Sequence, residues 1–574
     1  MRQFTYQPLP PRHIRFLNIS GNEDGLIYTI FDTNLDLAPV FTALSYTWDG
    51  QQRDQDLVCN GSILKVSKNV LRALPRLFQH DGSHNIWIDG VCINQDDESE
   101  KNIQVPLMQE IYSRTSKTVI WLGESGPNID EAINAIPTLL SVISGSGNEE
   151  VPTRSSPIWA GLHDLFYKPW FTRVWVFQEA ILPKAVEVIC GQNALPIEIM
   201  IELVHAVVNA FLIDRISGGA PTPPPGVWTL KLIETYKRWR SVGEHFSFSA
   251  LADMGRDLSC FDSRDKIYGL LGLAEESLRA EIVVDYQNKT AKELFLDVTK
   301  HEIANEPMLT ALHLSSKSPR TDLPSWCPNY GEPPTSSLII SLAEDYHAGN
   351  RNWIKRKAVS ARTTPFRART DGKVLHVQGV CLDRVDKIVA PGWILLNHTV
   401  ENIVENATKS LAWDAECFQI SQQIYKDEAL DTHSRILIGN SLRRERCISD
   451  QREIYDLMRR FVAVTAGKEP VGYVEEALTP EKWKDLPDYS KQVSLACSNR
   501  TFFTMGDRRV GLGPPTLQTG DTVCIISNTF TPFIIRSTTS GRHELIGEAY
   551  VHGLMYGEIF DLVDEGKFQE ILLD

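Results

Sequence analysis

The first third of the chain alternates short apolar runs with longer segments in which apolar residues recur every three to four positions. Residues 42–48 are a β-prone run that stops at Asp49-Gly50, as a strand entering a turn would. Residues 56–66 contain two β runs around Asn60-Gly61, which suits a type I′ hairpin turn because both residues tolerate a positive φ. Three further strands are predicted at 86–88, 118–122 and 186–190.

The segments between these strands have the periodicity of helices. Ser67 can cap a helix whose apolar positions, from Val70 to Phe78, share one face, although Pro75 should kink or shorten it. A second helix is predicted over about 98–113, with Ile103, Leu107, Ile111 and Tyr112 at helical spacing. Three more are predicted at 128–142, 157–167 and 172–182. Strands that alternate with helices indicate a mostly parallel sheet with helices on both faces.

The pattern changes after residue 192. From about 195 to 312 it is mainly helical, broken by a linker rich in Gly and Pro at 218–226. From about 372 onward β signals return, interrupted by a helical stretch at about 398–463. The predicted C-terminal strands are 374–385, 522–526, 532–536 and 545–551. Gly511 to Pro515 lacks the lysine and hydroxyl of a phosphate loop and indicates a turn before the β segment.

We therefore expect a multidomain α/β protein. Its predicted parts are an N-terminal β extension (1–37), an α/β domain with a mostly parallel sheet (38–192), a mainly helical middle domain (193–365) and a β-rich C-terminal domain with the helical insertion (366–574).

Composition and charge argue against several classes of protein. The net charge is 58 − 73 = −15 without an extended Lys or Arg cluster, so binding of nucleic acid lacks its electrostatic footprint. The ten cysteines form no CxxC pair and have no zinc-like His spacing, so we expect free thiols and no metal. There is no signal-peptide pattern at the N-terminus, and no apolar run reaches the roughly 18 residues of a membrane span, so the expected location is the cytoplasm.

Four segments together resemble the signature blocks of the fungal heterokaryon-incompatibility (HET) domain. They are 43–48 (ALSYTW), 86–95 (IWIDGVCINQ), 119–124 (VIWLGE) and 170–179 (WFTRVWVFQE). The segments 6–19, 261–272 (FDSRDKIYGLLG) and 511–557 are similar to further parts of long HET proteins. Two departures are Asp49 between Trp48 and Gly50, where the family has Trp-Gly directly, and Pro106, which argues for a bend in its helix.

This resemblance implies a role in non-self recognition and programmed cell death after fusion of unlike fungal cells. HET domains have also been likened to TIR domains, some of which cleave NAD with a glutamate on a helix, and Trp175 to Glu179 is similar to the Trp-x-x-x-Glu pattern that carries it. By this likeness Glu179 is the candidate catalytic residue, NAD is a candidate substrate, and no resident cofactor is expected.

Ligands of an open parallel sheet bind beyond the carboxyl ends of its strands. Tyr46, Trp48, Asp89, Cys92 and Glu124 should emerge at that edge, and Glu179 can face the same edge if its helix starts beside it. The candidate substrate-binding residues are Ser45, Tyr46, Trp48, Asp89 and Glu124.

Each of these residues also has a structural interpretation. Glu179 can stabilise positive charge as nicotinamide leaves the ribose, an attraction of about 4 kcal/mol at 4 Å and a dielectric of 20, or it can simply pair with Arg173. Asp89 can orient a ribose hydroxyl or cap the turn that follows its strand. Tyr46 and Trp48 can stack on a ligand ring or fill the core, and Trp87 is expected in the core.

Three other residues are expected to be structural. Cys92 has no neighbouring His to make it a nucleophile, so it is predicted to be a small buried apolar residue. Arg173 and Trp175 are predicted to lock the last helix of the domain onto the sheet. His552, on a C-terminal β segment, is given no functional role.

Two hypotheses about function follow. The first is a cell-death effector whose HET domain hydrolyses a nucleotide such as NAD when assembled into oligomers. The second is a non-enzymatic signalling module that recruits protein partners through its surface. A metabolic hydrolase is disfavoured because the sequence contains no Gly-x-Ser-x-Gly elbow and no metal-ligand cluster.

Overall fold

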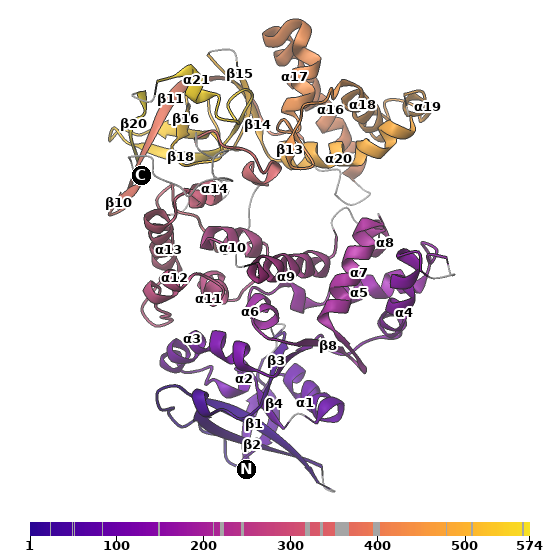
Figure 1. The fold of residues 1–574 in the computed structure, drawn as a ribbon, viewed down its shortest axis with the longest axis vertical. Coiled ribbons are helices and arrows are strands. Elements are labelled where there is room, and N and C mark those ends of the chain that lie inside the picture. The colour runs from indigo at the N-terminus through magenta and orange to yellow at the C-terminus, as the bar shows by residue number, and fades with distance from the viewer. Residues whose placement is uncertain are drawn as a thin grey trace. The chain divides into compact units, whose positions relative to one another are not determined.

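The computed structural model forms two compact units, Met1–Leu294 and Phe295–Asp574, with elements labelled as in Figure 1. It describes all residues except 23–24, 49, 51, 83, 147–149, 211, 219–222, 243–245, 316–321, 333–336, 350–366, 394–401, 478, 507–508 and 565–566. Asp49, part of the predicted 218–226 linker and the predicted boundaries near 365 and 398 therefore lie outside the described residues. The other predicted domain boundaries stay predictions.

The first unit contains a nine-stranded mixed sheet in the order β5-β4-β2-β1-β6-β3-β7-β8-β9. Its strands are β1 (His13–Asn22), β2 (Gly25–Asn34), β3 (Thr42–Tyr46), β4 (Gln55–Cys59), β5 (Ser62–Val66), β6 (Asn85–Trp87), β7 (Lys117–Trp121), β8 (Val186–Cys190) and β9 (Asn193–Pro196). The four central strands β6, β3, β7 and β8 are parallel. If these four strands are numbered 1 to 4 in chain order (β3, β6, β7, β8), their order across the sheet is 2-1-3-4. This is the arrangement of a doubly wound flavodoxin-like sheet.

The predicted α/β class is confirmed, although only these central strands form a continuous parallel set. The pair β1–β2 joins β6 antiparallel, while β5 and β9 add antiparallel edges, so the sheet is mixed. The N-terminal β segment is therefore part of this sheet. The predicted Asn60-Gly61 hairpin is confirmed, with φ of 51° and 72° at these two residues.

The helical elements of this unit are η1 (Leu35–Leu37), α1 (Lys68–Asp81), α2 (Asp89–Cys92), α3 (Glu98–Arg114), α4 (Pro127–Ile143), α5 (Pro157–Phe166), η2 (Pro169–Thr172), α6 (Val176–Ile181), α7 (Ile197–Asn209), α8 (Ile213–Ile216), α9 (Pro225–Ser241), α10 (Phe248–Gly255), α11 (Asp265–Leu271) and α12 (Glu276–Glu281), and α13 (Ala291–Asn305) follows. Ser67 caps α1 by accepting from the Val70 amide, and the helix continues past Pro75 to Asp81. Helices α4, α5, α7, α8 and α9 gather into a bundle (Figure 1).

Two predictions in this unit are wrong in detail. The predicted helix 172–182 is interrupted: η2 ends at Thr172, Arg173 is extended, and α6 begins only at Val176. The physical reason is that the Val174 amide donates to Ser259 O at 3.0 Å, so this backbone pairs with a distant segment. On α3 the predicted apolar face is shifted, since Ile103 is 57% exposed while Gln104, Met108, Ile111 and Tyr112 are buried.

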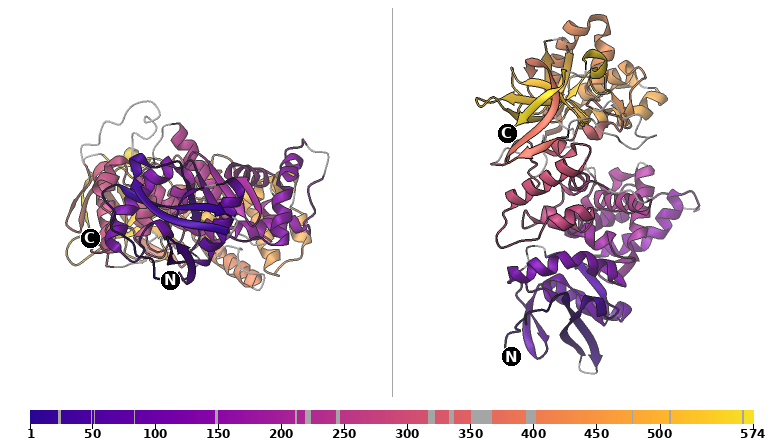
Figure 2. Two further views of the ribbon diagram at one scale, coloured as in Figure 1. Left: turned by 90° about the horizontal axis from the view of Figure 1, so that it is seen from below. Right: turned by 60° about the vertical axis from the view of Figure 1, so that its left-hand side comes forward.

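The second unit contains a barrel. Its strands are β10 (Arg369–Asp371), β11 (Val374–Val389), β14 (Thr501–Met505), β15 (Arg509–Gly513), β16 (Thr522–Ile526), β17 (Phe533–Ser537), β18 (His543–Glu548), β19 (Tyr550–Val551) and β20 (Gln569–Leu573). Strands β16, β17, β18, β20 and β11 follow one another, and β11 also pairs with β16, which closes the ring. The right-hand view of Figure 2 shows the yellow strands and the orange β11 curving around one another.

A helical insertion separates β11 from its antiparallel neighbour β14. It comprises α16 (Ile403–Tyr425), η5 (Lys426–Glu428), α17 (Ala429–Ile436), the short pair β12 (Ser441–Leu442) and β13 (Glu445–Arg446), α18 (Arg452–Thr465), α19 (Gly472–Glu475) and α20 (Pro480–Cys497). Along the chain, α14 (Thr310–Ser315) and η3 (Ile340–Leu342) precede β10, and α21 (Ile559–Leu562) precedes β20. The insertion reaches Cys497, beyond the predicted end at 463.

The interpretation of Gly511 to Pro515 as a turn is wrong for its first residues. Gly511 and Gly513 lie in β15, where a Cβ on Gly511 would come within 2.5 Å of the Phe503 ring. These glycines therefore serve close packing between strands rather than a turn.

Candidate functional site

The candidate site lies at the carboxyl end of β3, next to β7. Of the four parallel strands, β6 is the next after β3 in the chain and lies on one side of β3, whereas β7 lies on the other side. The strand order therefore reverses between β3 and β7. Crevices at such points are where doubly wound sheets bind ligands. Successive residues of β3 point to opposite faces of the sheet, so Ser45 and Tyr46 open on different sides of this edge.

Glu179 is hydrogen-bonded to Ser45 inside the domain. The Ser45 hydroxyl donates to Glu179 Oε2, and the Trp170 indole donates to Ser45 Oγ at 2.6 Å. Glu179 is only 2% exposed. The buried hydrogen bond between Ser45 and Glu179 therefore links strand β3 to helix α6.

Arg173 interacts electrostatically with both acidic residues of the site. Its Nη1 donates to the carbonyl of Tyr46 and lies 3.8 Å from Glu179 Oε2. The Arg173 charge also acts on Asp89. The extended backbone before α6 is what sends this side chain to the sheet edge.

Asp89 opens the short helix α2 directly after β6. Its Oδ1 accepts from the Gly90 amide at 2.7 Å and its Oδ2 from the Trp48 indole at 3.3 Å, while the Tyr46 hydroxyl also bonds this carboxylate. Gly90 is required here, because a Cβ would collide with the Tyr46 hydroxyl. The rings of Tyr46 and Trp48 are stacked with centroids 6.4 Å apart.

Burial dominates the electrostatics of this site. Burial raises the pKa of Glu179, against the lowering effects of Arg173 and Ser45, and burial likewise raises the pKa of Asp89. Burial lowers the pKa of Arg173, but the attraction of Glu179 and Asp89 outweighs it and leaves this pKa above its ordinary value. A single cation therefore serves two carboxylates in a poorly solvated environment.

The remaining candidates lie outside this cluster. The Glu124 side chain is exposed, and its backbone carbonyl accepts from Lys168 Nζ at 2.9 Å. Trp87 is buried and lies edge-on to Tyr112, with ring centroids 5.5 Å apart. Cys92 is buried, and burial raises the pKa of its thiol to about 12, so it is not a thiolate near neutral pH.

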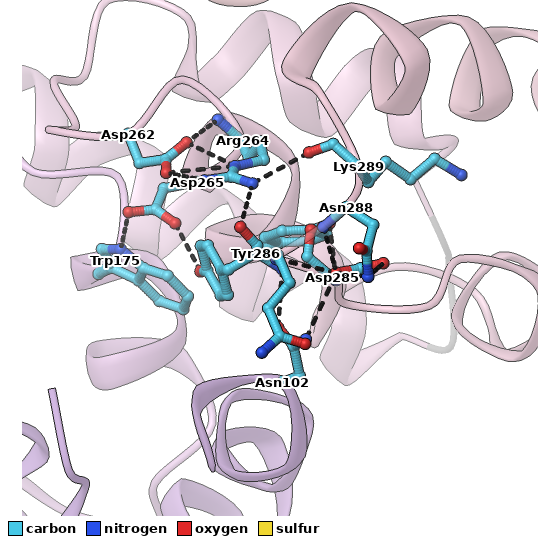
Figure 3. Close-up of polar contacts among 11 residues, drawn as sticks. Asn102, Trp175, Asp262, Arg264, Asp265, Asp285, Tyr286, Asn288 and Lys289 are labelled. Carbon is cyan, nitrogen blue, oxygen red and sulfur yellow. Dashed lines mark hydrogen bonds and ion pairs between the residues drawn. The ribbon is translucent and has the colours of Figure 1, made fainter. Parts of the chain in front are cut away.

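Trp175 contacts Asp265, which lies about 90 residues further along the chain and which the spacing of the motifs did not connect with the candidate site. Its indole donates to Asp265 Oδ2 at 3.2 Å, and the Tyr286 hydroxyl donates to Asp265 Oδ1 at 2.7 Å (Figure 3). Burial raises the pKa of Asp265 to about 6. Gln178, next to Glu179, donates from its amide to Gly269 O at 2.9 Å.

Tyr286 is itself held on several sides. Its amide donates to Asn102 Oδ1 at 2.7 Å, and its carbonyl accepts from Arg264 Nη1 at 2.8 Å (Figure 3). Arg264 and Lys101 lie over its ring, 5.0 and 5.3 Å from the centroid. We name the segment Ser259 to Lys289 the clamp, because it holds residues 174–178 beside the sheet. Within the clamp, the sequence singles out only the block 261–272, by its similarity to long HET proteins.

Among the described residues no group of three or more His, Cys, Asp or Glu side chains could hold a metal ion. All ten cysteines are free thiols. In the same part of the chain, every helix is too short or too polar to cross a bilayer.

An α/β domain with its polar cluster at the switch point, followed by a barrel, matches two known families. Residues 41–179 match the family model "Heterokaryon incompatibility protein (HET)", and residues 486–571 match the "Het-6 beta-barrel domain". The chain therefore contains one segment that matches the HET domain and another that matches the Het-6 barrel. The matched HET segment ends at Glu179, so the clamp lies beyond it.

Two curated relatives are similar to this chain. Over 97% of its length it is 23% identical to "Heterokaryon incompatibility protein 6, OR allele" of Neurospora crassa, of which 96% is covered. Over 27% of its length it is 24% identical to "Vegetative incompatibility protein HET-E-1" of Podospora anserina, of which 10% is covered. No solved structure matches the chain.

Proposed function

We propose that this protein acts in the cytoplasm as an effector of heterokaryon incompatibility, in fungal non-self recognition that ends in programmed cell death. The observation that carries the proposal is similarity along almost the whole chain to a Neurospora incompatibility protein, with HET and barrel segments in the same molecule. In this proposal it acts together with protein partners or by self-assembly.

We further propose that the HET domain hydrolyses NAD at the edge formed by Ser45, Asp89 and Glu179. The support is a cation and two carboxylates gathered at the switch point of a doubly wound sheet. In this reaction the bond between ribose C1′ and the nicotinamide nitrogen breaks, and nicotinamide leaves with the bonding electron pair. Water then adds its oxygen to C1′ and releases one proton.

The Glu179 carboxylate would stabilise the positive charge that develops on the ribose as this bond breaks. Because Glu179 is bonded to Ser45 and paired with Arg173, the substrate must displace one of these contacts to reach it. Tyr46 and Trp48 would then contact the nicotinamide or the adenine ring.

The second candidate is a non-enzymatic adaptor, and the burial of Glu179 favours it. A carboxylate that is 2% exposed and satisfied by a hydroxyl and a guanidinium can act purely as a lock between β3 and α6. In that case the surface of the domain carries the signal.

Purified full-length protein, tested in an assembled state, separates the two candidates. Glu179→Gln keeps the size of the side chain and removes its charge, while Glu131→Gln changes an exposed residue of α4 and serves as the matched control. NAD consumption by the wild type and the control that is lost in Glu179→Gln, while circular dichroism shows that this variant is still folded, supports hydrolysis. Equal, negligible turnover by all three proteins in a demonstrably assembled sample supports the adaptor.

A further inference from the structure

A cavity of about 350 Å³ opens between α16 and α18 in the helical insertion, outside both segments that match known families. Its size is at the lower end of the roughly 300–1,000 Å³ of small-molecule sites. Ala412 and Ala415 of α16 and Ala463 of α18 form one wall. Because each of these side chains is a single methyl group, the two helices leave room for a ligand between them.

Arg459 presents a fixed cation to this cavity. Its Nε lies 2.9 Å from Oδ2 of Asp414, which is 1% exposed and does not line the cavity. Asp414 is held in turn by the Tyr455 hydroxyl at 3.1 Å and by His433 Nε2 at 3.1 Å. The positive end of this ion pair therefore faces the cavity, and its negative end is buried behind it.

The terminal nitrogens of Arg459 remain available for a ligand. Among the described residues the recorded partners of the Arg459 guanidinium are the Asp414 carboxylate, at Nε, and the Tyr455 ring, whose centre lies 5.7 Å from Cζ. Since a guanidinium presents its donors in a rigid planar fork, this edge suits an oxyanion that accepts two hydrogen bonds side by side.

Two more cations border the cavity. Arg460 donates from Nε to Asp456 at 2.8 Å and from Nη1 to Tyr473 O at 3.1 Å, and its guanidinium lies 4.4 Å from the centre of the Tyr473 ring. Lys468 is exposed at the rim. An anionic group bound beside Arg459 would therefore have the side chains of three cations, Arg459, Arg460 and Lys468, around the same cavity.

Acidic groups also line the cavity, and they narrow the class of ligand. The Asp456 carboxylate is already bonded to Arg460, whereas Glu469 is exposed at the rim. A ligand that is only an anion cannot bond to the Glu469 carboxylate. A ligand with hydroxyl groups can donate a hydrogen bond to it. The ligand therefore combines an anion with hydroxyl donors on a body small enough for the alanine wall.

We propose that this cavity binds a phosphorylated sugar, either free or as the sugar phosphate of a nucleotide. The phosphate lies against Arg459 and Lys468, the ring lies on Ala415 and Ala463, and its hydroxyl groups face Glu469 and Asp456. A phosphate fits better than a carboxylate because its three terminal oxygens can accept from several cations at once. This site is independent of the chemistry proposed for the HET domain.

Isothermal titration of the full-length protein tests the proposal with ribose 5-phosphate, AMP, inorganic phosphate and unphosphorylated ribose. We expect saturable binding of ribose 5-phosphate, no binding of ribose, and binding of inorganic phosphate that is about tenfold weaker. AMP that binds more tightly than ribose 5-phosphate would identify the sugar phosphate as part of a nucleotide. Equal affinities for ribose 5-phosphate and inorganic phosphate would overturn the assignment of the sugar.

Variants locate the binding in the cavity. Ala463→Leu fills the wall and should abolish binding, and Arg459→Lys keeps the charge beside Asp414 but removes the planar fork, so affinity should fall about tenfold. Lys468→Gln, at an exposed position, should weaken binding roughly threefold without affecting folding. Lys491→Gln, an exposed residue of α20 away from the cavity, is the matched control and should bind like the wild type.

The proposal is overturned if neither ester binds the wild type saturably, or if Ala463→Leu and Lys468→Gln both bind as the wild type does. Should Ala463→Leu fail to fold, Lys468→Gln against Lys491→Gln decides the question.

Discussion

Arg173 Nη1 lies 3.8 Å from Glu179 Oε2, and this pair joins the extended segment before α6 to the helix itself. The Glu179 side chain is 3% exposed and that of Arg173 19%. Neither charge has enough water around it to be stable alone, so the pair is a condition for folding as well as a candidate for chemistry.

Arg173→Gln should destabilise the first unit by about 3 kcal/mol, because it leaves the Glu179 charge buried and unpaired. The double variant Arg173→Gln with Glu179→Gln should recover part of this loss, because only Asp89 is then left without the cation. Urea unfolding of the four proteins of this cycle measures the effect. Additive losses in the double variant would contradict the proposed coupling.

Gly90→Ala should destabilise the site by about 1–3 kcal/mol, since the added Cβ collides with the Tyr46 hydroxyl. Tyr46→Phe in the same protein removes the colliding oxygen and should restore part of the stability. Thermal unfolding of the single and double variants provides the measurement. A Gly90→Ala protein as stable as the wild type would show that the Tyr46 ring can move aside.

Asp265 should make stability depend on pH. Its pKa is raised to about 6 in the folded protein, above the value of about 3.9 for an unfolded chain, so the folded state holds this proton more tightly. Its contribution is fully present below about pH 4 and is lost as the pH rises through about 6. Asp265→Asn should flatten this part of the profile relative to the wild type. Parallel profiles of unfolding midpoint against pH would contradict the shift.

The clamp predicts where the functional unit ends. A fragment of residues 1–294 should fold, whereas residues 1–192 should not, because the Val174 amide, the Trp175 indole and the Gln178 amide lose their partners. Circular dichroism and amide hydrogen exchange of both fragments test this. A cooperatively folded 1–192 fragment would show that the clamp is dispensable.

Local signals predicted the elements well. Asn60-Gly61 specified its hairpin because the turn needs two positive φ values, and Ser67 marked the start of α1 through a cap formed three residues away. Glu179 was expected at the edge of the sheet only if its helix started beside that edge, and the structure brings it into a hydrogen bond with Ser45. Their roles in function stay predictions.

Tertiary partners account for what the sequence did not predict. The late start of α6 depends on the backbone of Ser259, and nothing near Trp175 in the chain points to Asp265. Gly511 has the local signature of a turn, yet it lies in a strand because the Phe503 ring occupies the space of its missing side chain. The cavity at Arg459 likewise depends on two helices whose spacing only the fold determines.

Val389 and Phe502 are direct partners in the β11–β14 ladder, although the entire helical insertion separates them along the chain. Joining them closes a loop of roughly a hundred residues, a step with a large entropic cost unless the enclosed helices have already collapsed. Both residues also contribute to the core that these helices bury. Assembly of the barrel should therefore wait for the insertion, and a mutation among its helices would first appear as slow or failed maturation of strands that it does not touch.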